Sequence, residues 1–246
     1  MIDLQKRYHQ YRQGNRSITH ETILTLADFD GFAAQCDFNC DQFHLRQCTR
    51  SGILLPDTLM TASTKRQAAY FAGRYAAMLA LRRMIGGKVT VGRGVDGEPL
   101  WPEAVVGSIT HTNESAYCAV SGNQHYQAIG IDMEPYIDAK TAAELHPRIL
   151  SKKESDYVNC IDAPFEHLLT LVFSAKESLY KALFPLCHQH FCFLDAEVTL
   201  IDYANKSFEL ALLRDLNKTL ASGGLYNGAF ECREKEVLTI LLYKNK

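Results

Sequence analysis

Two carboxylates lie one residue apart in Gly130–Pro135, an otherwise apolar segment that reads GIDMEP. Read as a β-strand, this segment directs Asp132 and Glu134 to one face, because side chains alternate between the two faces of a strand. A third carboxylate, Glu177, occurs in the helix-like segment FSAKESLYK, residues 173–181. Three hard oxygen ligands suit Mg²⁺, which commonly completes its coordination with water and substrate phosphate.

Lysines accompany these acids. Glu177 and Lys181 are four residues apart and therefore share one face of a helix, and Lys176 adds a second cation. Cations beside a carboxylate metal site suit a polyphosphate better than a neutral substrate. Two structural alternatives stay open: a surface ion pair between Glu177 and Lys181, worth less than about 1 kcal/mol, and a solvent-facing edge strand for Asp132 and Glu134.

A strongly basic segment precedes the acids. Residues 63–93 contain no acidic residue and seven basic ones: Lys65, Arg66, Arg74, Arg82, Arg83, Lys88 and Arg93. On a helix, Arg66, Tyr70 and Arg74 would form one stripe, which could bind the phosphates and base of a nucleotide. A solvated helix face is the alternative, and it is the preferred interpretation of Arg82 and Arg83.

The composition limits the class of protein. The chain has 246 residues with 26 Lys and Arg against 28 Asp and Glu, so its overall charge indicates no nucleic acid and no anionic membrane as a partner. The N-terminal segment lacks an apolar core of signal-peptide length, and the longest apolar runs are too short to span a bilayer. We therefore expect a cytoplasmic protein without a membrane span, with its eight cysteines reduced.

Two clusters of cysteine and histidine offer zinc binding as an alternative chemistry. They comprise Cys36, Cys40, His44 and Cys48, and later Cys187, His188, His190 and Cys192. A continuous helix cannot place four successive turns around one tetrahedral ion, and the chain has no Cys-x-x-Cys pair. Buried or surface thiols are therefore the preferred interpretation.

The elements that must position the candidate residues follow from periodicity and turn signals. In the first half we predict a helix over 63–84, strands over 89–91, 107–111 and 117–120, and a turn at 94–97. In the second half we predict the GIDMEP strand, helices over 139–150 and 165–184, and strands over 196–202 and 237–243. This repetition indicates an α+β fold with two similar, pseudo-twofold-related subdomains, residues 1–122 and 123–246.

Five segments together resemble the 4′-phosphopantetheinyl transferase superfamily, in its Sfp-type, enterobactin synthase component D-like branch. They are KRQAAYFAGR (65–74), GEPLWP (97–102), GSITHT (107–112), GIDMEP (130–135) and FSAKESLYKALFP (173–185). Their order and spacing agree with the family, and the likeness covers roughly residues 60–200.

The resemblance implies a function. Members of this family transfer the phosphopantetheine arm of coenzyme A to a serine of an apo acyl or peptidyl carrier protein and release adenosine 3′,5′-bisphosphate. It further implies a monomer with Mg²⁺ and coenzyme A bound in a cleft between the two halves. Siderophore, nonribosomal peptide or polyketide assembly is the pathway it suggests.

The resemblance also assigns roles to residues. Asp132, Glu134 and Glu177 match the Mg²⁺ ligands, and Lys176 and Lys181 would stabilise the pyrophosphate. The coenzyme A contacts would come from Arg66, Arg74, Gly97, Glu98, Pro99, Thr110 and His111. The base that deprotonates the carrier serine would be Glu177 or a metal-bound water oriented by Asp132. Many relatives have Lys where this chain has Asp96, and Arg93 could supply that charge instead.

Two other functions use the same residues. A Mg²⁺-dependent phosphohydrolase acting on a nucleotide would need the three acids but no acceptor protein. A catalytically inactive regulator that binds coenzyme A or a carrier protein would need neither the acids nor Lys181, so their presence argues against it.

Overall fold

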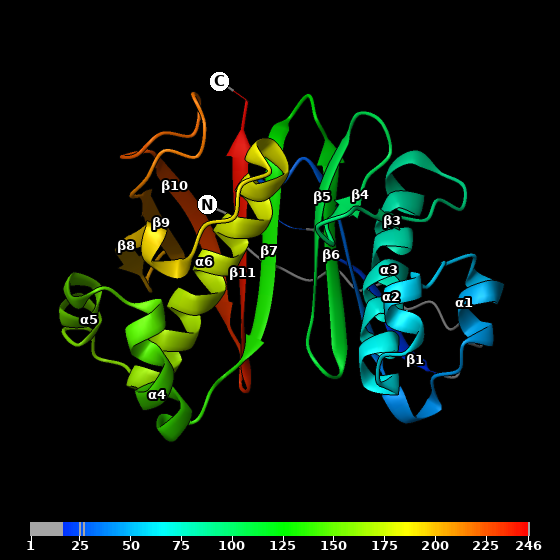
Figure 1. Ribbon diagram of the computed structural model, residues 1–246, viewed down its shortest axis with the longest axis horizontal. Coiled ribbons are helices and arrows are strands. Elements are labelled where there is room, and N and C mark those ends of the chain that lie inside the picture. The colour runs from blue at the N-terminus through cyan, green and yellow to red at the C-terminus, as the bar shows by residue number, and fades with distance from the viewer. Residues whose placement is uncertain (1–16, 25, 27, 246) are drawn as a thin grey trace. The chain divides into compact units, whose positions relative to one another are not determined.

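The computed structural model describes residues 17–24, 26 and 28–245 (Figure 1). They form two compact units. The N-terminal unit comprises the described residues up to Gln127 with Lys244 and Asn245, and the C-terminal unit comprises Ala128–Tyr243. Each unit combines helices with its own β-sheet, so the predicted α+β class is confirmed.

The N-terminal unit contains a four-stranded antiparallel sheet in the order β1-β2-β6-β5. Its strands are β1 (Ile18–Leu24), β2 (Gly31–Phe38), β5 (Val105–His111) and β6 (Ser115–Gly122). Neither β1 nor β2 was predicted, because the sequence before residue 58 carries no strong alternating pattern. The remaining small elements are η1 (Cys40–Gln42), α1 (Arg46–Ser51), α2 (Asp57–Met60), β3 (Gly92–Arg93) and β4 (Pro99–Leu100).

One long helix, α3 (Thr64–Ile85), packs on β2 and β6 of this sheet. It begins at Ser63, whose hydroxyl accepts a hydrogen bond from the Arg66 amide, and ends at Gly86, which has a φ of 75°. Many of its buried residues are alanines, and their small side chains let the helix approach the strands closely. The helix predicted over 63–84 is confirmed, whereas the strand predicted over 89–91 is wrong, because the pairing begins only at Gly92.

The C-terminal unit contains a five-stranded sheet in the order β7-β11-β10-β9-β8. Its strands are β7 (Tyr126–Pro135), β8 (Ala196–Asp202), β9 (Ser207–Leu212), β10 (Leu225–Cys232) and β11 (Glu236–Lys244). The first residues of β7 belong to the N-terminal unit and the rest to this one. The predicted strands at 130–135, 196–202 and 237–243 are confirmed, and β9 and β10 were not predicted.

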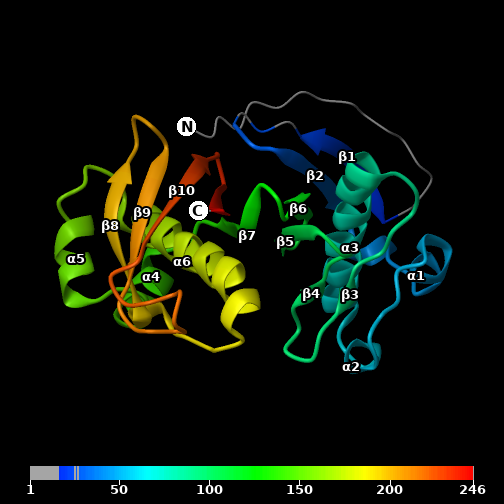
Figure 2. The same cartoon turned by 90° about the horizontal axis from the view of Figure 1, so that it is seen from above.

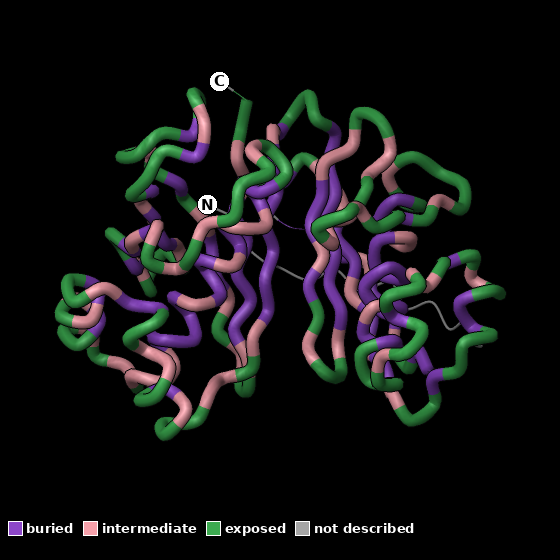
Figure 3. Tube along the Cα trace, viewed as in Figure 1, coloured by how far each residue is buried: buried purple, intermediate pink, exposed green. Residues whose placement is uncertain are grey.

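Helices cover one face of this second sheet, with α6 (Phe165–Cys187) lying across it (Figure 2). The others are α4 (Ala139–Ile149), α5 (Lys152–Val158) and the short η2 (Phe193–Asp195). Asp138 caps α4 through the Thr141 amide, and Ser151 and Glu154 form a capping box at the start of α5. Buried positions follow the middle of β7 and much of α6 (Figure 3). Asp132 and Lys176 are buried, whereas Glu134 and Glu177 are partly exposed.

Candidate active site

The three predicted metal-binding carboxylates come from two neighbouring elements of the C-terminal unit. β7 carries Asp132 and Glu134 on one face, and α6 carries Glu177. Asp132 is 2% exposed and forms an ion pair with Lys181, one helical turn beyond Glu177. The Lys181 side chain is 27% exposed, so its ammonium can reach a ligand from the solvent side.

The acids interact with one another electrostatically. The pKa of Glu134 is raised to about 7, mainly by burial and then by the charge of Asp132; Lys181 opposes this shift, and Glu177 adds a smaller upward contribution. Burial also raises the pKa of Glu177, although Lys181 opposes that effect. Three carboxylates thus share one ammonium in a partly dry environment, and a divalent cation would offset the excess negative charge.

The donor set fits Mg²⁺ in its chemistry. Within the described ranges, no three His, Cys, Asp or Glu side chains already have the arrangement of a complete metal site. Mg²⁺ does not require one, because it retains waters and takes phosphate oxygens alongside one or two carboxylates. Asp132, Glu134 and Glu177 could therefore hold the ion together with water and a substrate phosphate.

The two cysteine and histidine clusters have other surroundings. Cys36 is buried in β2, where its thiol donates to the Ala72 carbonyl at 3.3 Å. Cys48 is also buried, and Cys192 is exposed. His190 accepts or donates a hydrogen bond with the Tyr180 hydroxyl at 2.6 Å, and stacks on the same ring.

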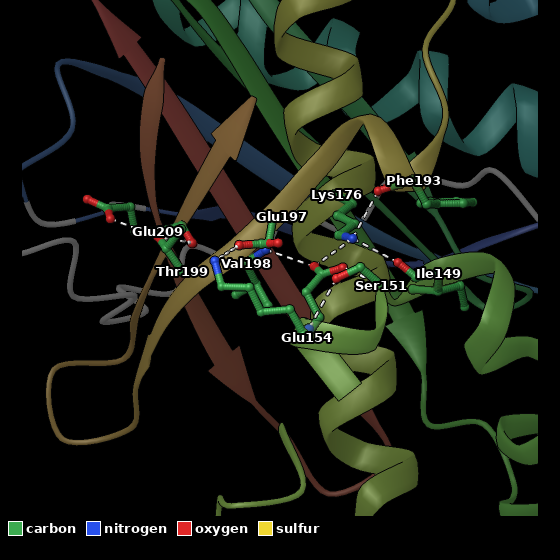
Figure 4. A network of polar contacts seen from close by, with 10 residues as sticks. Ile149, Ser151, Glu154, Lys176, Phe193, Glu197, Val198, Thr199 and Glu209 are labelled. Atoms are coloured by element: carbon green, nitrogen blue, oxygen red, sulfur yellow. Dashed lines mark hydrogen bonds and ion pairs between the residues drawn. The ribbon is translucent and has the colours of Figure 1, made fainter. Parts of the chain in front are cut away.

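The surroundings of Lys176 differ from the predicted contact with a pyrophosphate. Its side chain is 2% exposed, and its ammonium contacts three acceptors: the Glu154 carboxylate at 2.7 Å, the Ile149 carbonyl at 2.8 Å and the Phe193 carbonyl at 2.9 Å. Figure 4 shows this network at the junction of α4, α5, α6 and β8. An ammonium has three donors, so a pyrophosphate would have to displace one of these buried partners. Lys176 therefore serves the packing of the unit.

Glu154 was not singled out from the sequence, yet it lies at the centre of a buried polar network. Its carboxylate accepts from the amides of Ser151 and Val198, both at 2.8 Å, in addition to binding Lys176. The spacing Ser-x-x-Glu at 151–154 is a recognisable capping-box signal. Its second role, as the counter-ion of Lys176, has no signal in the local sequence.

The basic stripe predicted on α3 is only partly present. Arg66 is exposed near the start of the helix, whereas Arg74 is buried, with its guanidinium 4.7 Å from the centre of the Tyr70 ring. Arg74 donates to the Gly92 carbonyl at 3.1 Å, and burial lowers its pKa. Tyr70 and Arg74 therefore form a stacked pair beneath the β3-β4 hairpin instead of an open cationic surface.

The hairpin of β3 and β4 brings Arg93 over its own turn. Gly97 has a φ of 95°, and a Cβ at that position would lie 2.9 Å from Arg93 Nη2. The Glu98 carboxylate accepts from the Asp96 amide at 3.0 Å, so it stabilises the turn that Asp96 occupies. In this unit the charge of Arg93 also acts on Arg74, contributing to the lowered pKa.

The end of β5 lies beside α3. A Cβ on Gly73 would be 4.0 Å from His111 Cδ2 and 2.9 Å from Ile109 Cγ2, so this glycine permits the close approach. His111 is exposed at the end of the strand, and Thr110 is buried. The structure thus brings His111 next to the helix that carries Arg74, within one unit.

Comparison with known proteins gives the family. A model of the 4′-phosphopantetheinyl transferase N-terminal domain matches residues 55–121, and a model of the 4′-phosphopantetheinyl transferase superfamily matches residues 128–233. The chain is 33% identical over 155 residues to the 4′-phosphopantetheinyl transferase Npt of Nocardia iowensis, a match that covers 61% of this chain and 68% of that protein. The chain belongs to the 4′-phosphopantetheinyl transferase superfamily.

Two further relatives are both named Enterobactin synthase component D. The protein from Salmonella typhimurium is 43% identical over 126 residues, covering 51% of this chain and 52% of its own length. The protein from Salmonella typhi is 39% identical over 148 residues, covering 59% of each chain. The chain thus matches a little more than half the length of these Salmonella relatives.

The two family matches fall within the two units. The superfamily match includes all of the candidate acids and Lys181, and the match to the N-terminal domain includes Arg66, Arg74 and His111. The strands β1 and β2 precede the first match, and β11 follows the second. In this member of the superfamily, a strand beside β7 is therefore supplied by sequence outside the matched region.

Along the described part of this superfamily member, no helix combines the length and apolar character needed to cross a bilayer.

Proposed function

We propose that this chain transfers the 4′-phosphopantetheine arm of coenzyme A to a serine hydroxyl of an apo acyl or peptidyl carrier protein. The products are the holo carrier protein and adenosine 3′,5′-bisphosphate. The observation that carries the proposal is the cluster of Asp132, Glu134, Glu177 and Lys181 in a member of this superfamily. Its excess negative charge suits a metal-bound pyrophosphate, and its one partly exposed ammonium suits a developing phosphate charge.

The proposed transfer exchanges one phosphorus–oxygen bond for another. The serine oxygen attacks the phosphorus next to the pantetheine, and the bond from that phosphorus to the nucleotide's bridging oxygen breaks. Glu177 accepts the serine proton, and its raised pKa makes it a stronger base than an exposed glutamate. Lys181 stabilises the negative charge that develops on the leaving phosphate.

Mg²⁺ would supply Lewis-acid stabilisation of the pyrophosphate when bound to these carboxylates. Asp132 forms an ion pair with Lys181, and this pair orients both side chains. Glu134 must release its proton before it can act as a ligand, because burial and neighbouring charges raise its pKa.

For the nucleotide portion of coenzyme A we propose contacts from the N-terminal unit. Arg66 and His111 are exposed and can bind phosphate oxygens, and Arg93 supplies the charge that Asp96 lacks. Arg74 contributes through the Tyr70 stack, and Thr110 and the segment Gly97–Pro99 shape the pocket. We do not include Lys176, because its ammonium already contacts three buried acceptors.

The wider setting is also proposed. The relatives named Enterobactin synthase component D support a carrier domain of siderophore or other nonribosomal peptide assembly as the acceptor. We propose a monomer acting in the cytoplasm, with coenzyme A and the apo carrier protein as its partners and no nucleic acid.

The test is the intact mass of a purified apo peptidyl carrier protein after incubation with this chain, coenzyme A and Mg²⁺. We expect the mass to increase by one phosphopantetheine arm and the increase to disappear with EDTA. A carrier variant with its acceptor serine replaced by alanine is the control. Phosphate release without carrier modification would indicate a phosphohydrolase, and coenzyme A binding without either product would indicate a regulator; both results would overturn the proposal.

A further inference from the structure

The contact between α6 and the sheet contains a buried cluster of hydroxyls. Thr239 of β11 is fully buried, and its Oγ1 lies 2.9 Å from Ser174 Oγ and 2.7 Å from Ser178 Oγ. It also donates to the Ser174 carbonyl at 2.9 Å. A threonine hydroxyl has one donor and two acceptor positions, so these three contacts use all of them.

This cluster clamps one turn of α6. Ser174 and Ser178 are four residues apart and face β11 together, and the Ser178 hydroxyl also reaches the Thr239 carbonyl at 3.3 Å. Glu177 belongs to the same turn. Whatever fixes Ser174 and Ser178 therefore also fixes where the Glu177 backbone lies.

A second contact holds the same turn against β7. A Cβ on Gly130 would lie 1.8 Å from the Ser178 carbonyl oxygen and 3.1 Å from the Ala182 nitrogen, so only glycine allows this approach. Gly130 is two residues before Asp132 on the same face of the strand. Since β7 and β11 are neighbours in the sheet, Ser178 is held by both strands at once.

We propose that Thr239 is a positioning residue for the transfer, because its hydroxyl sets the distance from Glu177 on α6 to the acids on β7. This inference rests on the proposed function. Thr239 touches none of the groups proposed to contact substrate, and it lies beyond the segment that the superfamily model matches. Its effect would pass entirely through Ser174 and Ser178.

The physical basis is the cost of losing the shared acceptor. Replacing Thr239 by Val keeps the shape of the side chain but leaves two buried serine hydroxyls and one helix carbonyl to find other partners. The serine hydroxyls can then bond carbonyls one turn earlier in α6, which tends to bend a helix, or the turn can shift relative to β11, and we expect either change to displace Glu177. A displacement of about 0.5–1 Å at a catalytic group is enough to lower a rate up to about 100-fold.

The experiment compares three variants of the full chain. Thr239→Val removes the hydroxyl, and Thr239→Ser retains it. Thr170→Val is the control for losing a buried hydroxyl elsewhere on α6: the Thr170 hydroxyl donates to the Glu166 carbonyl of its own helix at 2.6 Å and accepts from the Ile137 amide at 3.3 Å. For each we would measure kcat, KM for coenzyme A, the Mg²⁺ dissociation constant by calorimetry, and thermal unfolding.

We expect Thr239→Val to lower kcat about tenfold or more, with KM for coenzyme A within about twofold of the wild type. Its Mg²⁺ affinity should fall, because one of the three carboxylates would be displaced. Thr239→Ser, which retains the hydroxyl, should keep kcat and Mg²⁺ affinity close to the wild-type values. Thr170→Val should lose thermal stability while retaining kcat.

Several results would overturn the inference: a Thr239→Val protein with wild-type kcat and Mg²⁺ affinity, a Thr239→Ser protein as impaired as the valine variant, or an equal loss of kcat in Thr170→Val. If Thr239→Val does not fold, Ser178→Ala is measured in its place, since it removes one of the two hydroxyl partners. A wild-type chain that modifies no carrier would overturn the proposed function, and the Mg²⁺ affinities would still decide the positioning role.

Discussion

Two ion pairs on α6 differ in almost every respect that matters for function. Lys181 pairs with Asp132 in a cluster where carboxylates outnumber ammonium groups, and 27% of its side chain is exposed. Lys176 pairs with Glu154, and at most 2% of either side chain is exposed. We call the Lys181–Asp132 pair the open pair, because it is partly exposed and lies among excess carboxylates. We call the Lys176–Glu154 pair the closed pair, because it is buried and its two charges cancel. Two lysines five residues apart on one helix can therefore lie in very different surroundings, and we propose a role in the transfer only for Lys181.

The strongest test of the open pair is Glu177→Gln. If Glu177 accepts the serine proton, kcat should fall by about 100-fold to 10 000-fold, because the amide cannot act as a base. Coenzyme A should still bind, which equilibrium titration would show. A variant with near-normal turnover would contradict the assignment of Glu177 as base.

The corresponding test of the closed pair is Lys176→Met. Removing one partner leaves the Glu154 carboxylate buried without its cation, which should lower the free energy of unfolding by about 3–5 kcal/mol. Urea unfolding of the full chain gives the measurement. If the variant lost turnover while retaining wild-type stability, Lys176 would belong to the reaction after all and the distinction between the two pairs would fail.

Glu134→Gln sharpens the account of the open cluster through pH. Because the pKa of Glu134 in the folded protein is about 7, above its value in the unfolded chain, ionisation costs stability as the pH rises towards 7. In EDTA at pH 8 the variant should be more stable than the wild type by about 1–2 kcal/mol, after allowance for partial solvation. Near pH 4 this advantage should vanish.

Adding Mg²⁺ at pH 8 should reverse the order, because only the wild type gains a ligand from the ionised side chain. Urea titrations at both pH values, with and without the metal, provide the comparison. An identical pH dependence for the two proteins would show that Glu134 carries no excess charge in the cluster.

The smallest expected effect concerns a third ion pair, between Lys153 and Glu197. The Lys153 side chain is 79% exposed, so solvent and salt screen its interaction. Lys153→Met should change the free energy of unfolding by less than about 1 kcal/mol. If Lys153→Met lowered the free energy of unfolding as much as Lys176→Met, burial could not explain the difference between a surface ion pair and the pairs on α6.

Much of the C-terminal unit could be predicted from local sequence. Alternation in GIDMEP and the apolar periodicity of residues 165–184 indicated β7 and α6, and the structure has both. The strand period places Asp132 and Glu134 on one face of β7, and the packing of α6 on β7 brings Glu177 close to them. The strands β9 and β10 were missed, since their pairing depends on partners from elsewhere in the chain.

Two basic residues were assigned to ligand binding from their spacing together with the family resemblance, and neither could show how buried they are. Helical spacing placed Arg74 in line with Arg66, but it could not show that Arg74 is 6% exposed beneath the β3-β4 hairpin. Lys176 was predicted to be a second cation beside Glu177. Its partner Glu154 comes from α5, and no periodicity within α6 reveals that contact.

The sequence by itself determined the set of chemical groups, the long elements that carry them and the superfamily, because residue type and spacing along one strand or helix are local properties. Only the fold determines which lysine is partly exposed and which is buried, and that Thr239 bonds to the α6 turn of Ser174 and Ser178. Burial and counter-ions come from segments far apart in the chain. Thr239 lies 65 residues beyond Ser174, and only folding brings their hydroxyls together.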